Sequence, residues 1–164
     1  MEGNYRTYLN DGWLFSSEFS ESMKELDFSG KMESVRIPHT VCTTAYNSFP
    51  SEVYQKISCY RKVFKTQKSW QGKLVLLTIE GSAHKTEVYL NQKLLCTHNC
   101  GYTAFTADLT KALNAEDKDN VLCIKVDSRE TLDQPPFGFV IDYMTYGGIY
   151  RDVYLEVKNP VFIE

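Results

Sequence analysis

Long hydrophobic runs are missing from this sequence, since no apolar stretch approaches the roughly 20 residues that a membrane-spanning helix needs. Blocks of like charge are missing too, because Lys and Arg are scattered and the formal net charge is only −3. This charge pattern does not indicate nucleic acid or an anionic membrane as a partner. Residues 1–6 (MEGNYR) lack the basic-then-apolar order of a secretory signal, so we expect a cytoplasmic location.

The number of cysteines is odd, and the sequence shows no secretory signal. Neither observation indicates a disulfide framework, so we expect free thiols. Two of the cysteines flank His98, a spacing that raises the question of a metal site. A closed zinc site needs four ligands, however, and no second Cys/His pair sits at a matching spacing. We therefore expect no metal and no other cofactor. The five cysteines are Cys42, Cys59, Cys96, Cys100 and Cys123.

Long amphipathic helices are also lacking, and the 164 residues break instead into short segments typical of β-strands. The segment that begins at Asn120 shows the two-residue alternation well, because Leu122, Ile124 and Val126 share one face. We predict an all-β sandwich or jelly roll of eight to nine short strands, with long loops at 39–56 and 128–146. The predicted strands are 13–15, 35–37, 59–64, 74–79, two arms of a hairpin at 85–97, 102–105, 120–126 and 151–157, with a single helical turn at 108–113.

Six sequence motifs, which follow one another along the chain, carry more specific information than the strand pattern. They are 35–40 (VRIPHT), 59–64 (CYRKVF), 80–91 (EGSAHKTEVYLN), 98–105 (HNCGYTAF) followed by Asp108, 120–136, and 142–153 (DYMTYGGIYRDV). Together they resemble the N-terminal domain of family 2 glycoside hydrolases, the β-galactosidase and β-glucuronidase family. Two turn positions differ from the family pattern, where Gln92 replaces a hairpin glycine and Cys100 replaces the first glycine of a pair. Such a replacement costs about 1 kcal/mol, so it concerns turn geometry only.

The resemblance implies that residues 1–164 are a single N-terminal sugar-binding domain, with a galactose-binding-like jelly-roll fold, from a longer multidomain enzyme. In that family an immunoglobulin-like domain and a TIM barrel follow, and the barrel carries the two glutamates of a retaining mechanism. Such chemistry needs two carboxylates about 5 Å apart. Because this chain has no βα repeat, we expect it to contain no catalytic residue and to be inactive alone. The implied partners are the carbohydrate substrate of the full-length enzyme, the chain's own downstream domains and further copies in a homo-oligomer.

Asp142 acquires a role through this resemblance, and three neighbouring residues are interpreted from their own chemistry. Asp142 occupies the position from which a family Asp reaches into the barrel and accepts hydrogen bonds from sugar hydroxyls, so we predict that it binds substrate. Gly147 and Gly148 are predicted to supply backbone dihedrals that other residues avoid. Arg151 could contact a sugar, but we favour a structural ion pair that fixes the base of the loop. Asp133 lies in the same loop without support from a motif, and we expect it to be solvated.

Two other functions are compatible with a β-sandwich: a free-standing carbohydrate-binding module or lectin, and an adhesion or scaffold domain without a sugar role. Segment 142–153 favours the glycosidase domain, since a stand-alone module would have no reason to carry an active-site loop. Trp13 and Trp70 are candidates for stacking on sugar, although core packing is the better interpretation of aromatic residues in a sandwich. A hydrolase triad built on the three histidines is disfavoured, because no nucleophile-elbow sequence is present.

Overall fold

The computed structural model describes residues 6–46, 50–135, 137 and 145–161. Within these ranges the chain forms ten strands, and its helical structure is limited to three short segments. The strands are β1 (Arg6–Tyr8), β2 (Trp13–Ser16), β3 (Glu33–Val35), β4 (Ile57–Lys65), β5 (Leu74–Ile79), β6 (Lys85–Leu90), β7 (Lys93–Asn99), β8 (Phe105–Asp108), β9 (Asp119–Asp127) and β10 (Val153–Lys158). The helical segments are η1 (Glu21–Lys24), α1 (Ser51–Tyr54) and η2 (Lys68–Trp70).

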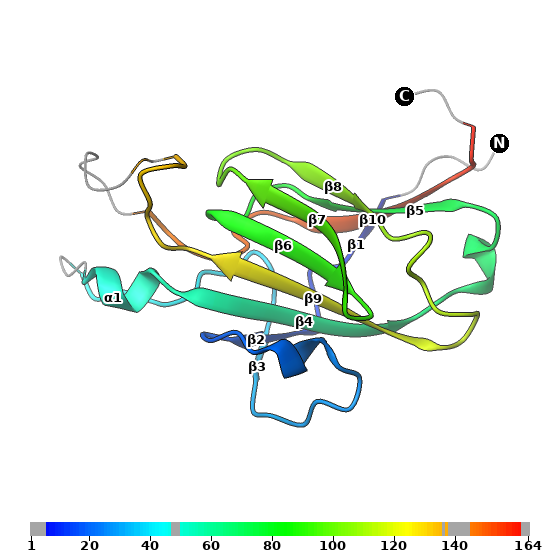
Figure 1. Cartoon of the computed structure of the whole chain (residues 1–164), viewed down its shortest axis with the longest axis horizontal. Helices are drawn as coiled ribbons and strands as arrows, with labels where there is room; N and C mark the ends of the chain where they lie inside the picture. Colours follow the sequence, from blue (N-terminus) through cyan, green and yellow to red (C-terminus); the bar gives the residue numbers. More distant parts are fainter. Residues whose placement is uncertain (1–5, 47–49, 136, 138–144, 162–164) are drawn as a thin grey trace.

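The strands form two antiparallel sheets that stack as a sandwich (Figure 1). One sheet has four strands in the order β1-β10-β5-β8, and the other has six in the order β3-β2-β4-β9-β6-β7. The longest pairing joins β4 to β9, with Ile57 opposite Asp127 at one end and Lys65 opposite Asp119 at the other. The all-β sandwich predicted from the sequence is confirmed, with ten strands in place of eight or nine.

The main core lies between the two sheets, because alternate residues of facing strands point inward. In β9, Leu122, Ile124 and Val126 are fully buried in it, as the alternation predicts. They meet residues of β5 from the opposite sheet, including Leu77 and Ile79. Burial of this kind stabilises a fold by about 1.5–3 kcal/mol for each large apolar side chain. The core therefore fixes the two sheets as a rigid frame for the loops at their ends.

A smaller cluster covers the outer face of the six-stranded sheet. Cys59 of β4 and Cys123 of β9 are buried there beneath Met23 of η1. The two sulfur atoms lie 3.3 Å apart, and all five cysteines of the chain are free thiols. Burial and the contact with Cys123 raise the pKa of the Cys59 thiol, which therefore stays protonated and unreactive.

Most strand boundaries differ by one or two residues from the sequence predictions, and three elements differ in kind. The strand expected at 102–105 is wrong, because pairing with β5 begins at Phe105 and Tyr102 lies in a bend. The helical turn expected at 108–113 is a hydrogen-bonded turn, in which Leu113 donates to the carbonyl of Leu109 at 3.1 Å. Strand β1 was not predicted, since its three exposed residues show no alternation. Loop 39–56 contains α1, and loop 128–146 includes residues outside the described ranges.

Candidate functional site

Residues 147–149 connect loop 128–146 to β10 and are held on both sides by backbone hydrogen bonds. Val41 donates to the carbonyl of Gly147 at 3.0 Å, and His39 donates to that of Ile149 at 2.8 Å. On the other side Ala83 donates to the carbonyl of Gly148 at 2.9 Å. The segment therefore lies at the end of the sandwich where β9 finishes, seen in orange at the left of Figure 1. Its position is fixed from residues far away in the sequence.

The two glycines of this segment occupy positions that a side chain would not fit. Gly148 has a φ of 108°, and a Cβ there would lie 2.6 Å from the Tyr60 hydroxyl and 2.7 Å from the His39 carbonyl oxygen. A Cβ on Gly147 would lie 2.3 Å from Oγ of Ser128. Close approach of the backbone is the reason that glycine is needed at both positions.

Tyr60 and the partly buried His39 form a hydrogen-bonded pair that contacts this segment. The Tyr60 side chain is fully buried, and its hydroxyl lies 2.9 Å from Nδ1 of His39. The backbone N–H of Ile149 donates to the same hydroxyl at 3.4 Å, so the hydroxyl proton is available to His39. Burial raises the pKa of Tyr60 and lowers the pKa of His39, which keeps both groups neutral. The pair therefore supports the segment structurally and carries no charge.

Arg151 and Asp152 contact different groups. Asp152 Oδ1 accepts a hydrogen bond from Nδ2 of Asn10 at 2.9 Å, whereas the Arg151 guanidinium lies 5.6 Å from the centre of the Tyr150 ring. Within the described part of the chain, Arg151 forms no ion pair. Its exposed side chain covers the Tyr150 ring, and it would touch a Cβ added at Gly81. Packing on an aromatic ring is therefore the role that these contacts give to Arg151.

A cavity of about 360 Å³ opens beside this segment, and we call it the loop-end cavity. Tyr102 and Tyr146 line it and are 44% and 54% exposed. His84 is 1% exposed, and neither of its ring nitrogens has a hydrogen-bond partner. The described lining contains no carboxylate, so it offers no acid/base pair. The lining consists of Ala83, His84, Tyr102, Thr145, Tyr146, Tyr150 and Arg151.

Two other polar groups at the loop-end cavity have protein partners. The Tyr150 hydroxyl donates to the carbonyl of Gly101, and the Thr145 hydroxyl donates to Oε1 of Glu130 at 2.5 Å. Burial lowers the pKa of His84, although the charges of Glu130 and Asp127 oppose the shift. His84 is therefore a neutral imidazole, which carries one donor and one acceptor nitrogen.

The predicted site residues are only partly within the described ranges. Asp142 lies outside them, whereas Gly147, Gly148 and Arg151 lie together at the end of the sandwich. Asp133 is exposed. His84, Tyr102 and Tyr150 were missed as lining residues by sequence reasoning. Only the fold brings them together, since they lie before β6, after β7 and before β10.

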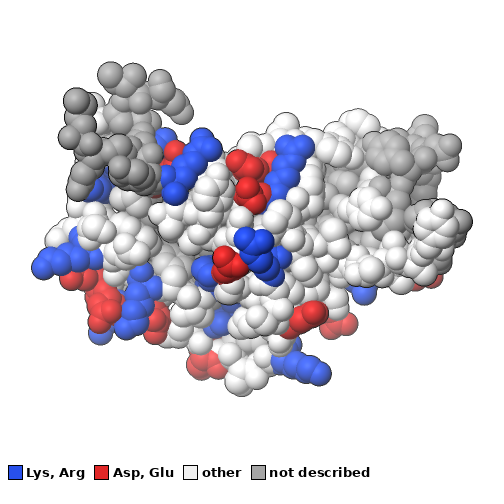
Figure 2. Space-filling model, turned by 180° about the vertical axis from the view of Figure 1, so that it is seen from behind, with Lys and Arg blue, Asp and Glu red and all other residues white. Residues whose placement is uncertain are grey.

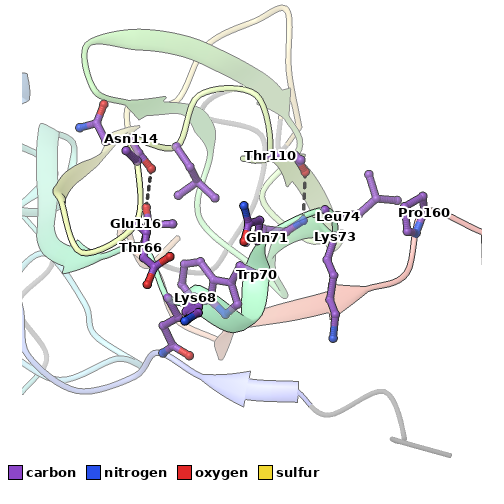
Figure 3. A pocket seen from close by; sticks show the side chains of 15 residues that line it. Thr66, Lys68, Trp70, Gln71, Lys73, Leu74, Thr110, Asn114, Glu116 and Pro160 are labelled. Carbon is purple, nitrogen blue, oxygen red and sulfur yellow. Dashed lines mark hydrogen bonds between the residues drawn. The ribbon is translucent and has the colours of Figure 1, made fainter.

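A second pocket, of about 510 Å³, lies at the opposite end of β4 and β9, and we call it the Trp70 pocket (Figure 3). Two of its polar groups are paired within the chain, since Thr66 donates to the carbonyl of Asn114 at 2.8 Å and Thr110 accepts from the N–H of Val75 at 2.9 Å. Trp70 is partly buried against Phe64, with ring centres 6.1 Å apart. The other tryptophan, Trp13, is fully buried in the main core.

The surface charge of the described residues is mixed. Figure 2 shows Lys and Arg interspersed with Asp and Glu on one face, without a large region of one sign. Within the described ranges, no group of three or more His, Cys, Asp or Glu side chains is placed to hold a metal ion. None of the helices in these ranges is long and apolar enough to cross a bilayer.

Comparison with known proteins identifies the family to which this fold and segment belong. Residues 33–160 match the family model for the sugar-binding domain of glycosyl hydrolases family 2. The chain is 35% identical to a β-galactosidase of Thermoanaerobacterium thermosulfurigenes over 156 residues, which cover 95% of this chain and 22% of that protein. It is 31% identical to a β-glucuronidase of Bacteroides fragilis over 157 residues, covering 94% and 21%.

A solved structure agrees with these matches. The model superposes on Bacteroides uniformis β-glucuronidase 2 with a TM-score of 0.84 and 29% identity, covering 94% of this chain and 18% of that one. The chain thus spans about a fifth of the length of these relatives. Since the family model covers most of the sequence, the chain belongs to glycoside hydrolase family 2 and corresponds to its sugar-binding domain.

Proposed function

We propose that this chain is the non-catalytic N-terminal domain of a retaining β-glycosidase of the β-galactosidase or β-glucuronidase type. The observation that carries the proposal is the family match over residues 33–160, combined with relatives about five times as long. The domain contributes loop 128–146 to the substrate pocket of the assembled enzyme, where Asp142 accepts hydrogen bonds from sugar hydroxyls. Catalytic carboxylates are supplied by downstream domains of the same polypeptide.

The geometry at the end of the sandwich supports a role in substrate contact for this domain, with catalysis left to the downstream domains. Gly147 and Gly148 fix the base of the loop against Tyr60 and Ser128, so the loop starts from a rigid frame. A binding group on a rigid base loses less conformational entropy when substrate binds. The described lining of the loop-end cavity contains no carboxylate, whereas glycoside hydrolysis needs two.

The proposal extends to the surroundings of the protein. Its partners are the carbohydrate substrate, the downstream domains of its own polypeptide and further copies of the enzyme in a homo-oligomer. We further propose a cytoplasmic enzyme, on the basis of the free thiols. Counting the labels after alkylation under denaturing, non-reducing conditions tests the thiol state, since five labels are expected and three would mean a disulfide.

Activity measurements on two polypeptides test the proposed function. One is the 164-residue chain, and the other is the same chain continued into its downstream domains. We expect only the longer polypeptide to hydrolyse aryl β-galactosides or aryl β-glucuronides. Hydrolysis by the 164-residue chain would contradict the proposal. A dissociation constant in the low micromolar range for a monosaccharide, about −8 kcal/mol, would favour the free-standing binding module instead.

A further inference from the structure

His84 is a buried polar residue whose hydrogen-bonding capacity is unused. It is 1% exposed, lines the loop-end cavity, and has no partner for either ring nitrogen. Buried polar groups in folded proteins almost always have partners, because an unpaired one loses its bonds to water without replacement. An exception that opens on a cavity points to a ligand that completes the pairing.

The chemistry of the imidazole restricts the kind of ligand. A neutral imidazole has one donor and one acceptor nitrogen. A hydroxyl group both donates and accepts, so it pairs with either nitrogen in either tautomer. A carboxylate or phosphate only accepts, and an ammonium group only donates. Hydroxylated ligands therefore fit His84 best.

The walls of the cavity restrict the ligand further. Tyr102, Tyr146 and Tyr150 line it together with the methyl group of Ala83, so its walls are largely aromatic and apolar. Its volume of about 360 Å³ lies at the small end of the range for ligand sites, roughly 300–1,000 Å³. The combination suits a single ring that has apolar C–H faces and hydroxyl groups on its edge.

We propose that the loop-end cavity binds one pyranose ring of a glycoside, with a ring hydroxyl hydrogen-bonded to His84 and the ring packed among the three tyrosines. The Tyr150 and Thr145 hydroxyls already have protein partners, whereas the buried His84 has none, so we assign the orienting hydrogen bond to His84. The assignment of the ring to an enzyme substrate rests on the proposed function, whereas the binding site itself does not.

Histidine NMR tests the binding directly, because the chain contains three histidines in different surroundings. His84 lines the cavity, His39 is bonded to Tyr60, and the His98 ring stacks on Phe105 with 4.3 Å between ring centres. In a titration of the 164-residue chain with methyl β-D-galactopyranoside, we expect the His84 ring signals to shift saturably at millimolar concentrations. The signals of His39 and His98 should not move. Glycerol serves as a control that has hydroxyl groups but no ring.

Two substitutions at the same position separate hydrogen bonding from shape. His84→Phe keeps a ring and removes both nitrogens, so we expect sugar binding to weaken at least about tenfold, the effect of one ordinary hydrogen bond. His84→Gln retains one donor and one acceptor group and should keep part of the affinity. Binding to both variants is followed through the tyrosine ring signals. Tyr46→Ala, at a residue 95% exposed and outside the cavity lining, is the control and should bind like the unaltered chain.

The longer polypeptide distinguishes this proposal from the proposed function. If it hydrolyses β-glycosides, His84→Phe should raise KM about tenfold with little change in kcat, as for a contact made equally in the ground and transition states. An unshifted His84 signal, or the same shift with glycerol, would overturn the cavity proposal and leave the proposed function intact. A sugar-dependent shift in a protein whose longer form hydrolyses no glycoside would support the cavity and reject the proposed function.

Discussion

The two ends of the sandwich contain cavities of about 360 and 510 Å³ that differ in their internal chemistry. At the Trp70 pocket, Thr66 and Thr110 are hydrogen-bonded within the chain, and Asn120 behind them bonds to several neighbours. At the loop-end cavity, both nitrogens of His84 lack partners. The polar groups named at the Trp70 pocket are paired, whereas the loop-end cavity contains one buried residue without a partner.

This difference separates stability from function. A satisfied polar network contributes to folding, and its pocket has no unmet demand for a ligand. An unsatisfied buried group costs folding free energy, about 1–3 kcal/mol, and persists where binding recovers it. We therefore assign a structural role to the Trp70 end and a binding role to the loop end. Three pairs of variants examine that assignment.

The largest effect is expected from alanine at a glycine of the loop end. Gly148→Ala combines a φ of 108° with a Cβ only 2.7 Å from a backbone carbonyl, so both strain and overlap destabilise the fold. We expect a loss of about 3–4 kcal/mol, or roughly 6–15 °C in Tm. Gly72→Ala at the Trp70 pocket is the matched variant, since its φ is 72° but nothing lies within 4 Å of the new Cβ. It should cost about 1 kcal/mol. Thermal unfolding of both compares them, and equal losses would show that the loop base is not tightly held.

A smaller loss is expected at the opposite end. Asn120 is fully buried, accepts from Asn91 Nδ2 at 2.9 Å and from the Asn114 N–H at 2.8 Å, and donates to Thr66 at 2.9 Å. Asn120→Ala removes these three bonds from a buried site and leaves the Asn114 N–H unpaired, so we expect a loss of about 2–3 kcal/mol in urea unfolding. Asn114→Ala removes only an exposed bond to the carbonyl of Asp119 and should cost less than about 1 kcal/mol. A silent Asn120→Ala would remove the structural role given to this end.

The smallest effect has the opposite sign. His84→Phe removes an unpaired buried group, so we expect the chain without ligand to become more stable by about 1–2 kcal/mol. The matched variant His98→Phe loses one bond to Thr103 at a partly exposed site and should change stability by less than about 1 kcal/mol. A destabilised His84→Phe chain would indicate that His84 is paired within the protein after all.

The pH dependence of the same variant gives a second measurement. Burial holds the pKa of His84 below its unfolded value near 6.5, so the unfolded chain binds more protons as the pH falls past that value. The stability contributed by neutral His84 is therefore present above about pH 6.5 and is lost progressively below it. His84→Phe lacks this loss, so its advantage over the unaltered chain should grow between about pH 7 and 5. His39, whose pKa is also lowered, remains in both proteins and cancels in the comparison.

The fold was largely predictable from the sequence, because alternation within a strand is local information. The alternation of Leu122, Ile124 and Val126 identified the inner face of β9, although the partner strands were not known. Strand β1 was not predicted, because its exposed residues lack that alternation. Its strand conformation comes from pairing with β10.

The candidate site was less predictable, because its contacts join distant parts of the chain. The motif at 142–153 indicated the segment, but the support from Tyr60 spans 89 residues to Ile149. Nothing in the sequence around His84 shows that it is buried without a partner beside Tyr102 and Tyr150. Such a feature depends on tertiary packing and is visible only in the folded structure.

The central claim, that this domain contributes a substrate-binding loop to a β-glycosidase, is tested most directly by the kinetics of two aspartate variants. In the polypeptide that includes the downstream domains, Asp142→Ala removes the proposed charge-assisted bond to a sugar hydroxyl, and Asp133→Ala removes an exposed carboxylate of the same loop. The account predicts a loss of kcat/KM of roughly thirty- to two-hundred-fold for Asp142→Ala, from about 2–3 kcal/mol of transition-state binding. For Asp133→Ala it predicts no loss beyond about twofold, with similar melting temperatures for both variants. Equal and unchanged kcat/KM values for the two variants would contradict it.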